Sequence, residues 1–266
     1  MGPQRGRFWT RAGDPAYPPT KRSRVRAGAV GLVYLGVFLL GFVAHQLFLT
    51  GFLASRAQGQ LETDLANRSV QLVEVIPLDN EGLPDEPTEV AVSYELETLP
   101  GDDLKIPIID PPDGTVLLTE PTPERGGALG RIRIPVIDVA WTAVEGVGRE
   151  QLKSGPGHMA TTPLPGQPGN AVISGHRTTY GAPFHDLDQL EPGSLIHWDS
   201  PVLGTSTYMV TEIFVVEPDE VWVTEPRPGG WLTLTTCNPL FSARERLIVV
   251  AKLVTGPNLA AIESTS

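Results

Sequence analysis

The stretch Trp231–Val254, WLTLTTCNPLFSARERLIVVAKLV, contains the only cysteine of the chain, Cys237, between two runs with strand character. The first run, Trp231–Thr236, alternates bulky apolar residues with threonine, which is typical of a half-buried strand. An Asn-Pro pair comes directly after the cysteine and ends the pairing pattern, so the sequence predicts that Cys237 lies at a strand end. The second run, Leu247–Val254, is apolar and β-branched and favours a partner strand.

Further short segments between residues 128 and 256 have strand composition and are separated by turn signals. They are 130–141, 143–147, 170–176, 194–199, 206–216 and 221–224. Between them, Lys153–Asn170 is rich in Gly and Pro and predicts an ordered loop, whereas Pro183–Leu190 has apolar spacing that predicts one short helix. The pattern therefore predicts a mainly β fold, a closed or nearly closed barrel of about eight strands.

Charge is distributed unevenly along the 266 residues. Residues 1–26 hold seven basic side chains and one acidic, whereas residues 54–128 hold four basic and sixteen acidic. The formal net charge of the whole chain is −11, and the sequence indicates no nucleic-acid surface. The 26 prolines and 28 glycines are too many for uniform globular packing, which indicates that part of the chain is linker.

An apolar run predicts a membrane anchor near the N-terminus. Residues 27–55 contain no formally charged side chain, and a helix of roughly 20 residues spans a bilayer. A cleaved signal peptide is the alternative, but its apolar core is usually only about 7 to 15 residues long. The basic residues before the run and the acidic ones after it place the N-terminus in the cytoplasm and everything beyond the run outside the cell membrane.

Five segments follow from these patterns. They are a basic cytoplasmic tail (1–26), a transmembrane helix (27–50), an acidic Pro-rich tether (51–128), a folded domain (129–256) and a C-terminal tail (257–266). The tether holds too little apolar surface to offset its chain entropy, which predicts a flexible stalk, although a cover over the functional face of the folded domain is the alternative.

A lone cysteine in an exported domain cannot form an intramolecular disulfide. Three interpretations of Cys237 then remain: a buried apolar filler, an intermolecular bridge or a reactive thiol. An unused thiol is a liability in an oxidising compartment, which favours the reactive thiol. Such a nucleophile needs a neighbouring base or cation to become a thiolate.

Four histidines lie beyond the predicted tether, namely His158, His176, His185 and His197. Only His176 closes a buried strand and is followed by a polar turn. One strand that ends in histidine and another that ends in cysteine can place imidazole and thiol at the same rim of a barrel. No Cys/His cluster has the spacing of a metal site, so no metal is expected.

Four motifs together resemble the sortase family, in particular its class E members from high-GC Gram-positive bacteria. In chain order they are PLPGQPGN (Pro163–Asn170), ISGHRTTYGAPF (Ile173–Phe184), TLTTCNP (Thr233–Pro239) and SARERLIVVA (Ser242–Ala251). The resemblance covers roughly residues 131–254 and implies an eight-stranded sortase barrel without a cofactor. It implies Cys237, His176 and Arg246 as catalytic residues, with Arg246 preferred over Arg244 because it directly precedes the strand LIVVA.

The resemblance also implies acyl transfer through a thioester. Cys237 would cleave an LPXTG-like sorting signal, with LAXTG the variant expected of class E, between Thr and Gly. A peptidoglycan amine would then take up the surface protein. Thr236 and Tyr180 are predicted to contact the substrate. Three alternatives stay open, namely an exported cysteine peptidase, a pilin-polymerising sortase and a non-catalytic domain that binds the cell wall.

Overall fold

The computed structural model describes residues 21–68, 73–78, 88–90, 95–98, 105–108 and 116–264. It divides into two compact units, residues 1–46 and residues 47–266. The predicted cytoplasmic tail, apart from its last residues, lies outside the described residues.

The first unit contains helix α1 (Lys21–Ala44), and a π-helical segment (His45–Leu49) follows this helix in the chain. The large apolar side chains of α1 from Val30 to Val43 are each at least 51% exposed. None of the helices in the described part of the chain reaches the length and apolar content expected of a membrane span. The transmembrane helix over residues 27–50 stays a prediction.

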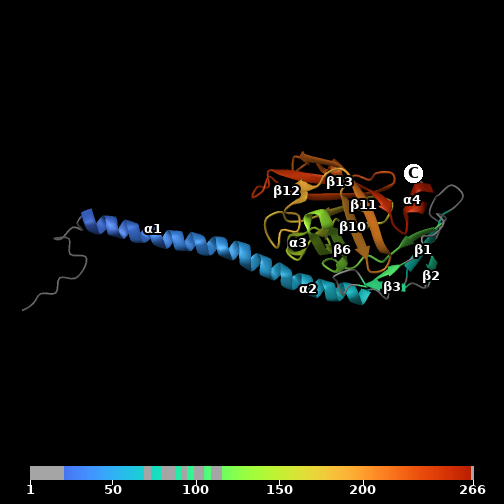
Figure 1. Ribbon diagram of the computed structural model, residues 1–266, viewed down its shortest axis with the longest axis horizontal. Coiled ribbons are helices and arrows are strands. Elements are labelled where there is room, and N and C mark those ends of the chain that lie inside the picture. Colours follow the sequence, from blue (N-terminus) through green and yellow to red (C-terminus); the bar gives the residue numbers. More distant parts are fainter. Residues whose placement is uncertain are drawn as a thin grey trace, which may run out of the picture. The chain divides into compact units, whose positions relative to one another are not determined.

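The second unit is built around a closed barrel of eight strands, as the sequence predicts (Figure 1). The strand order is β10-β11-β13-β12-β9-β8-β7-β6, and β6 pairs with β10 to close the ring. The strands are β6 (Ala128–Ile134), β7 (Val139–Glu145), β8 (Gly157–His158), β9 (Gly169–Ser174), β10 (Leu195–Ser200), β11 (Gly204–Val216), β12 (Gly230–Asn238) and β13 (Glu245–Thr255). The barrel thus spans almost the range predicted for the catalytic domain.

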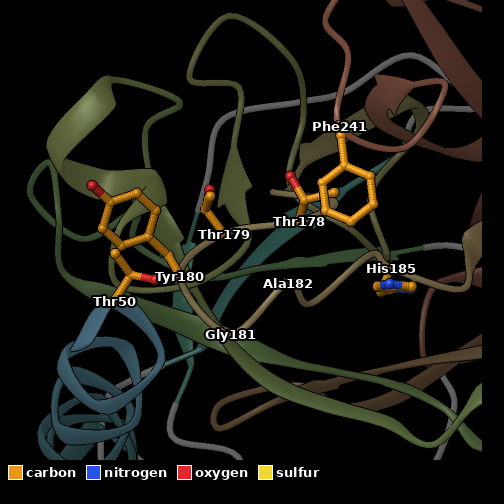
Figure 2. Close-up of a pocket in the computed structure, with 8 residues that line it drawn as sticks. All are labelled: Thr50, Thr178, Thr179, Tyr180, Gly181, Ala182, His185 and Phe241. Carbon is orange, nitrogen blue, oxygen red and sulfur yellow. The ribbon is translucent and has the colours of Figure 1, made fainter. Parts of the chain in front are cut away.

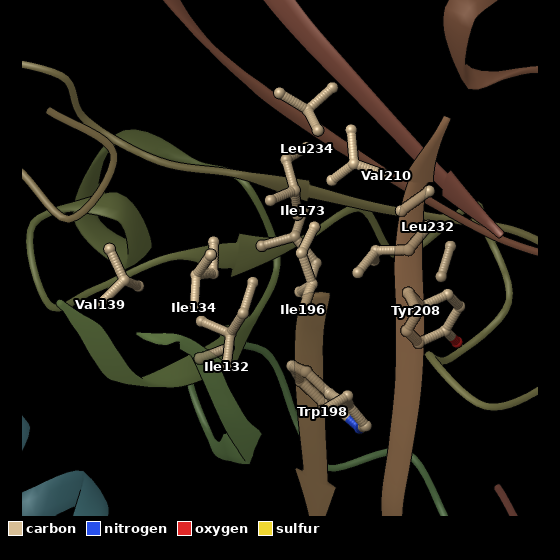
Figure 3. Close-up of a cluster of buried hydrophobic side chains, with 14 of the residues drawn as sticks. Ile132, Ile134, Val139, Ile173, Ile196, Trp198, Tyr208, Val210, Leu232 and Leu234 are labelled. Carbon is tan, nitrogen blue, oxygen red and sulfur yellow. The ribbon is translucent and has the colours of Figure 1, made fainter. Parts of the chain in front are cut away.

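Alternating apolar side chains from every long strand fill the barrel interior (Figure 3). On β12 these are Leu232 and Leu234, which have no exposed surface, and Thr233 between them faces the other way. Trp198 from β10 lies across Gly130 of β6, where a Cβ atom would collide with the indole ring. This alternation decides which residues at the strand ends can reach the outside of the barrel.

Short helical segments connect the strands and correct three predictions. They are η2 (Pro135–Ile137), α3 (Arg149–Leu152), η3 (Leu187–Gln189) and η4 (Val221–Thr224). The strand predicted over 130–141 is a hairpin, because Pro135 opens a 3-10 turn that ends at Asp138 in a left-handed conformation. The helix predicted over 183–190 is only the single turn η3, and the strand predicted over 221–224 is η4.

Helix α2 (Thr50–Arg68) occupies residues 51–68 of the range predicted as a flexible tether, and that prediction does not describe this part of it. Its buried side chains, spaced three or four residues apart, are Thr50, Ala54, Gln58, Leu61 and Leu65. The two leucines pack against Ala128 and Val144 of the barrel. The Gln58 side chain donates to the Thr142 carbonyl at 2.9 Å and accepts from the Thr142 amide at 2.8 Å. The helix is therefore packed on β6 and β7.

Regular structure also occurs in other segments outside the barrel. Strands β1 (Val73–Pro77), β2 (Thr88–Val90) and β5 (Val116–Thr119) form one sheet, and β3 (Glu95–Thr98) pairs with β4 (Lys105–Ile108). The predicted C-terminal tail contains α4 (Leu259–Ser264), whose Ile262 packs on the main core. Asn258 ties this end to β5, since its side chain bonds both backbone groups of Leu118.

A buried carboxyl group beside α2 makes the stability pH-dependent. Glu120 is 5% exposed, its closest basic group is Arg68 at 3.8 Å, and burial raises the pKa of Glu120 to about 7. The protonated group therefore makes its full contribution to the free energy of unfolding below its usual pKa of 4.5. This contribution is lost as the pH rises through 7. We expect the free energy of unfolding to drop by up to about 3 kcal/mol between pH 5 and pH 8.

Urea denaturation of the full chain at these two pH values, beside Glu120→Gln, measures this dependence. The variant removes the titrating group, so its unfolding free energy should change less than that of the wild type. Identical pH dependence in both proteins would contradict the assignment.

Candidate active site

Three neighbouring strand ends bring the predicted catalytic residues together. Strand β12 lies between β9 and β13 in the barrel. Cys237 is the registered partner of Arg246 across the antiparallel pair β12–β13. On the other side, Thr235 is registered with Ser174 of the parallel strand β9, and the Gly175 amide donates to the Thr235 carbonyl at 3.1 Å. The chain thus reaches His176 next to the end of β12.

The pleat of these strands puts the three side chains on one face. Ile173, Leu234 and Leu247 belong to the barrel core. Since side chains alternate between faces, Cys237 and Arg246 face outward, and continued alternation after β9 brings His176 to the same outer face. Gly175 lies between this histidine and the strand, and the Phe184 ring fills the space that a Cβ atom would need there.

His176 is half-buried, and this burial lowers the pKa of its imidazole below the usual 6.5. The ring lies against that of Tyr180, with 5.1 Å between the centroids and a tilt of 35°. At neutral pH the imidazole is therefore mostly uncharged, which is the form that can accept a proton.

Removal of the Tyr180 ring should raise the pKa of His176 towards 6.5, because water then reaches the imidazole. Tyr180→Gly suits this test, since the residue has a φ of 51° that glycine adopts without strain. An NMR titration of the imidazole measures the shift, with Phe241→Ala as the control. If Tyr180→Gly leaves the titration unchanged, this ring does not cause the burial effect.

Cys237 carries a free thiol that is partly exposed. Arg246 is also partly exposed, and its Nη1 donates to the carbonyls of Ala243 and Glu245 at 3.1 and 2.9 Å. These bonds hold the guanidinium over the loop that follows β12. Arg244 lies exposed in the same loop, as expected of a solvated residue.

Thr236 differs from its predicted role. Its side chain is 3% exposed, and its hydroxyl donates to the Gly175 carbonyl at 2.8 Å. The alternation of β12 places it on the face opposite to Cys237, so the side chain is turned away from the outer face. Its contact instead joins the end of β12 to the segment that leads to His176.

A pocket of about 280 Å³ lies beside these strand ends (Figure 2). Its lining comes from three parts of the chain, namely the start of α2, the loop after His176 and the loop after Cys237: Thr50, Thr178, Thr179, Tyr180, Gly181, Ala182, His185 and Phe241. Tyr180 thus lines a cavity, and its substrate contact stays a prediction. Phe241 is 82% exposed.

The backbone around this pocket is strained. Four described residues other than glycine have a positive φ, and three of them, Tyr180, Ala182 and Phe241, line the pocket. Such conformations cost energy, persist only where the surrounding structure maintains them, and gather at functional sites. Sequence reasoning did not identify Thr50 or Phe241, because neither belongs to a motif with recognisable chemistry. Over the described residues, no group of acidic, His or Cys side chains has the arrangement of a metal site.

Comparison with known proteins agrees with this arrangement. A family model described as the sortase domain matches residues 132–254. Sortase SrtE1 of Streptomyces coelicolor is 32% identical over 146 residues, which cover 49% of this chain and 42% of the relative. Sortase D of Bacillus subtilis is 33% identical over 137 residues, which cover 50% of this chain and 67% of the relative.

A solved structure of sortase E1 from Streptomyces coelicolor, with a tripeptide in its active site, is 33% identical to this chain. The match has a TM-score of 0.47 and covers 49% of this chain and 90% of the other. The present chain spans less than half the length of SrtE1 and about two thirds of sortase D. On the match to sortase D, this chain belongs to the sortase family.

Proposed function

We propose that this chain is a cysteine transpeptidase that acts on sorting signals of surface proteins. The observation that carries the proposal is the placement of Cys237, His176 and Arg246 at three adjacent strand ends on one outer face of the barrel. A thiol, an imidazole and a guanidinium supply the nucleophile, the acid/base group and the fixed positive charge that acyl transfer needs.

In the proposed reaction, His176 takes the proton of the Cys237 thiol, and the resulting thiolate attacks the carbonyl carbon of Thr in the Thr–Gly bond of an LPXTG-like signal. The C–N bond breaks, His176 gives a proton to the departing glycine amine, and a thioester forms on Cys237. An amine of peptidoglycan then attacks the thioester while His176 takes up its proton. Arg246 stabilises the negative oxygen of both tetrahedral intermediates.

The preferred signal in this proposal is LAXTG, which the class E resemblance of the motifs implies. The enzyme can be given a synthetic LAXTG or LPXTG peptide with and without an amine such as triglycine. The amounts of ligated product and of free acid then distinguish transfer from hydrolysis. A transpeptidase forms the ligated product and leaves little free acid, whereas a cysteine peptidase releases the acid whether or not the amine is present. A pilin-type enzyme would accept a lysine side chain in preference to the peptide amine.

We further propose that residues 27–50 anchor the enzyme in the cell membrane with its catalytic domain outside. The uncharged run 27–55 and the basic residues before it support this orientation. Because Cys237 is the only cysteine, a membrane-impermeant maleimide can report its location directly. Labelling of intact cells is expected, and Cys237→Ala should abolish it. Labelling only after lysis would contradict an extracytoplasmic site.

A further inference from the structure

A chain of hydrogen bonds joins the residues adjacent in sequence to the three catalytic candidates. Arg177 follows His176, and its Nη1 donates to Asn238 Oδ1 at 2.6 Å. Asn238 follows Cys237, and its Nδ2 donates to Glu245 Oε2 at 2.7 Å. Glu245 in turn precedes Arg246 and is the registered partner of Asn238. Each catalytic strand end is therefore bonded to the next through the neighbour of its catalytic residue.

Arg177 is the most buried of these three hydrogen-bonded residues. It is 3% exposed, and its guanidinium pairs with Asp188 at 2.7 Å. Two further bonds reach backbone carbonyls at 3.3 Å, one of His185 and one of Cys237 itself. The same side chain thus contacts the loop after His176 and the end of β12. A planar guanidinium can make several such bonds at fixed angles, which a lysine cannot reproduce.

The position of these bonds matters because neighbouring side chains alternate between faces. Residues that flank outward-facing catalytic groups point the other way, so Arg177, Asn238 and Glu245 can bond one another without covering the site. The chain leaves regular strand pairing beyond Ser174 and beyond Asn238. Between β9 and β12, where strand pairing ends at Ser174 and Thr235, the bond from Arg177 to Asn238 therefore replaces the strand ladder at the level where His176 and Cys237 must meet.

We propose that Arg177, Asn238 and Glu245 form a positioning clamp that sets the geometry of His176, Cys237 and Arg246. The inference rests on the proposed transpeptidase function, and it concerns positioning residues that do not touch the substrate. Loss of the clamp should misplace the reacting groups, and a misplacement of about 1 Å costs on the order of 100-fold in rate. The effect should fall on kcat, because the substrate surface itself is unchanged.

Arg177→Met in the full chain tests the central member. We expect kcat for peptide transfer to fall about 100-fold, with KM changed by less than about threefold. The second readout is the pH profile of Cys237 alkylation by iodoacetamide. Because the reactivity of a thiol depends on the imidazole and guanidinium beside it, the profile of the variant should differ from that of the wild type once the clamp is lost.

Milder variants keep the test decisive if Arg177→Met folds poorly. Asn238→Asp keeps the acceptor for Arg177 but places two carboxylates together and breaks the bond to Glu245, so a loss of about tenfold is expected. Glu245→Gln retains an oxygen that can accept from Asn238 and should stay within about threefold of wild type. Arg133→Met is the matched control, since it removes an arginine that makes two hydrogen bonds to the carboxylate of Asp199 on β10. This variant should keep the alkylation profile of the wild type.

The outcomes separate the clamp from the proposed function. A folded Arg177→Met or Asn238→Asp that keeps both kcat and the wild-type alkylation profile overturns the clamp. A wild type that transfers no peptide overturns the proposed function, and the alkylation profiles of the variants then still decide the clamp. Equal losses in Arg177→Met and Arg133→Met would show a general loss of stability and would also overturn it.

Discussion

Cys237→Ser should lower peptide transfer by about 10⁴-fold or more, because a serine hydroxyl forms far less of its anion at neutral pH than a thiol does and is the weaker nucleophile beside the same imidazole. The substitution changes a single atom at the end of β12, so the barrel should stay intact. The thiol itself lies across the strand pair from Arg246, its registered partner on β13.

Chromatography of the transfer product, with the unfolding midpoint measured in parallel, checks this prediction. Because the chain has no second cysteine, residual activity cannot come from another thiol. Transfer by Cys237→Ser within about tenfold of wild type would contradict nucleophilic catalysis by this residue.

Substitution of His176 by glutamine should lower transfer by about 10³-fold, the usual contribution of a positioned acid/base group. Glutamine keeps hydrogen-bonding ability and similar bulk. It cannot donate a proton to the departing glycine amine or take one from the incoming amine. The pKa of His176 lies below 6.5 through burial, so we expect the amine-transfer step to persist below pH 6.5 and to fail as the imidazole becomes protonated.

His197→Gln is the matched control for this variant. Burial also lowers the pKa of His197, but this residue sits on β10, where its Nδ1 lies 3.0 Å from the Thr207 hydroxyl. Transfer should stay within about threefold of wild type in the control. Equal losses in the two variants would remove His176 from the mechanism.

Local patterns were sufficient to predict the strands that carry the site. Alternating residues identify β12, and the Asn-Pro pair marks its end, so Cys237 could be placed from neighbours in the sequence alone. Arg246 follows from the same stretch, since it precedes the apolar run of β13. The same alternation could have shown that Thr236 faces away from Cys237, because adjacent residues of a strand point to opposite faces.

Contacts between distant segments were not predictable in this way. Helix α2 buries Ala54 and Gln58 next to its two leucines, so its packed face has a weak apolar signal. The partners of Gln58 are 84 and 96 residues away. Arg177 reads as one polar residue in a polar turn, and only its bonds to Asn238 and Asp188 reveal that it is buried.

Intact-mass spectrometry of the full chain with an LAXTG peptide is the most direct test of the proposed activity. Without an amine, the account predicts that the mass rises by that of the peptide up to and including its threonine, less one water. Addition of triglycine should remove the adduct and form the ligated peptide, and Cys237→Ser should show neither thioester nor product. A folded wild-type chain that forms no adduct with either LAXTG or LPXTG peptides, and no ligated product, would contradict the account.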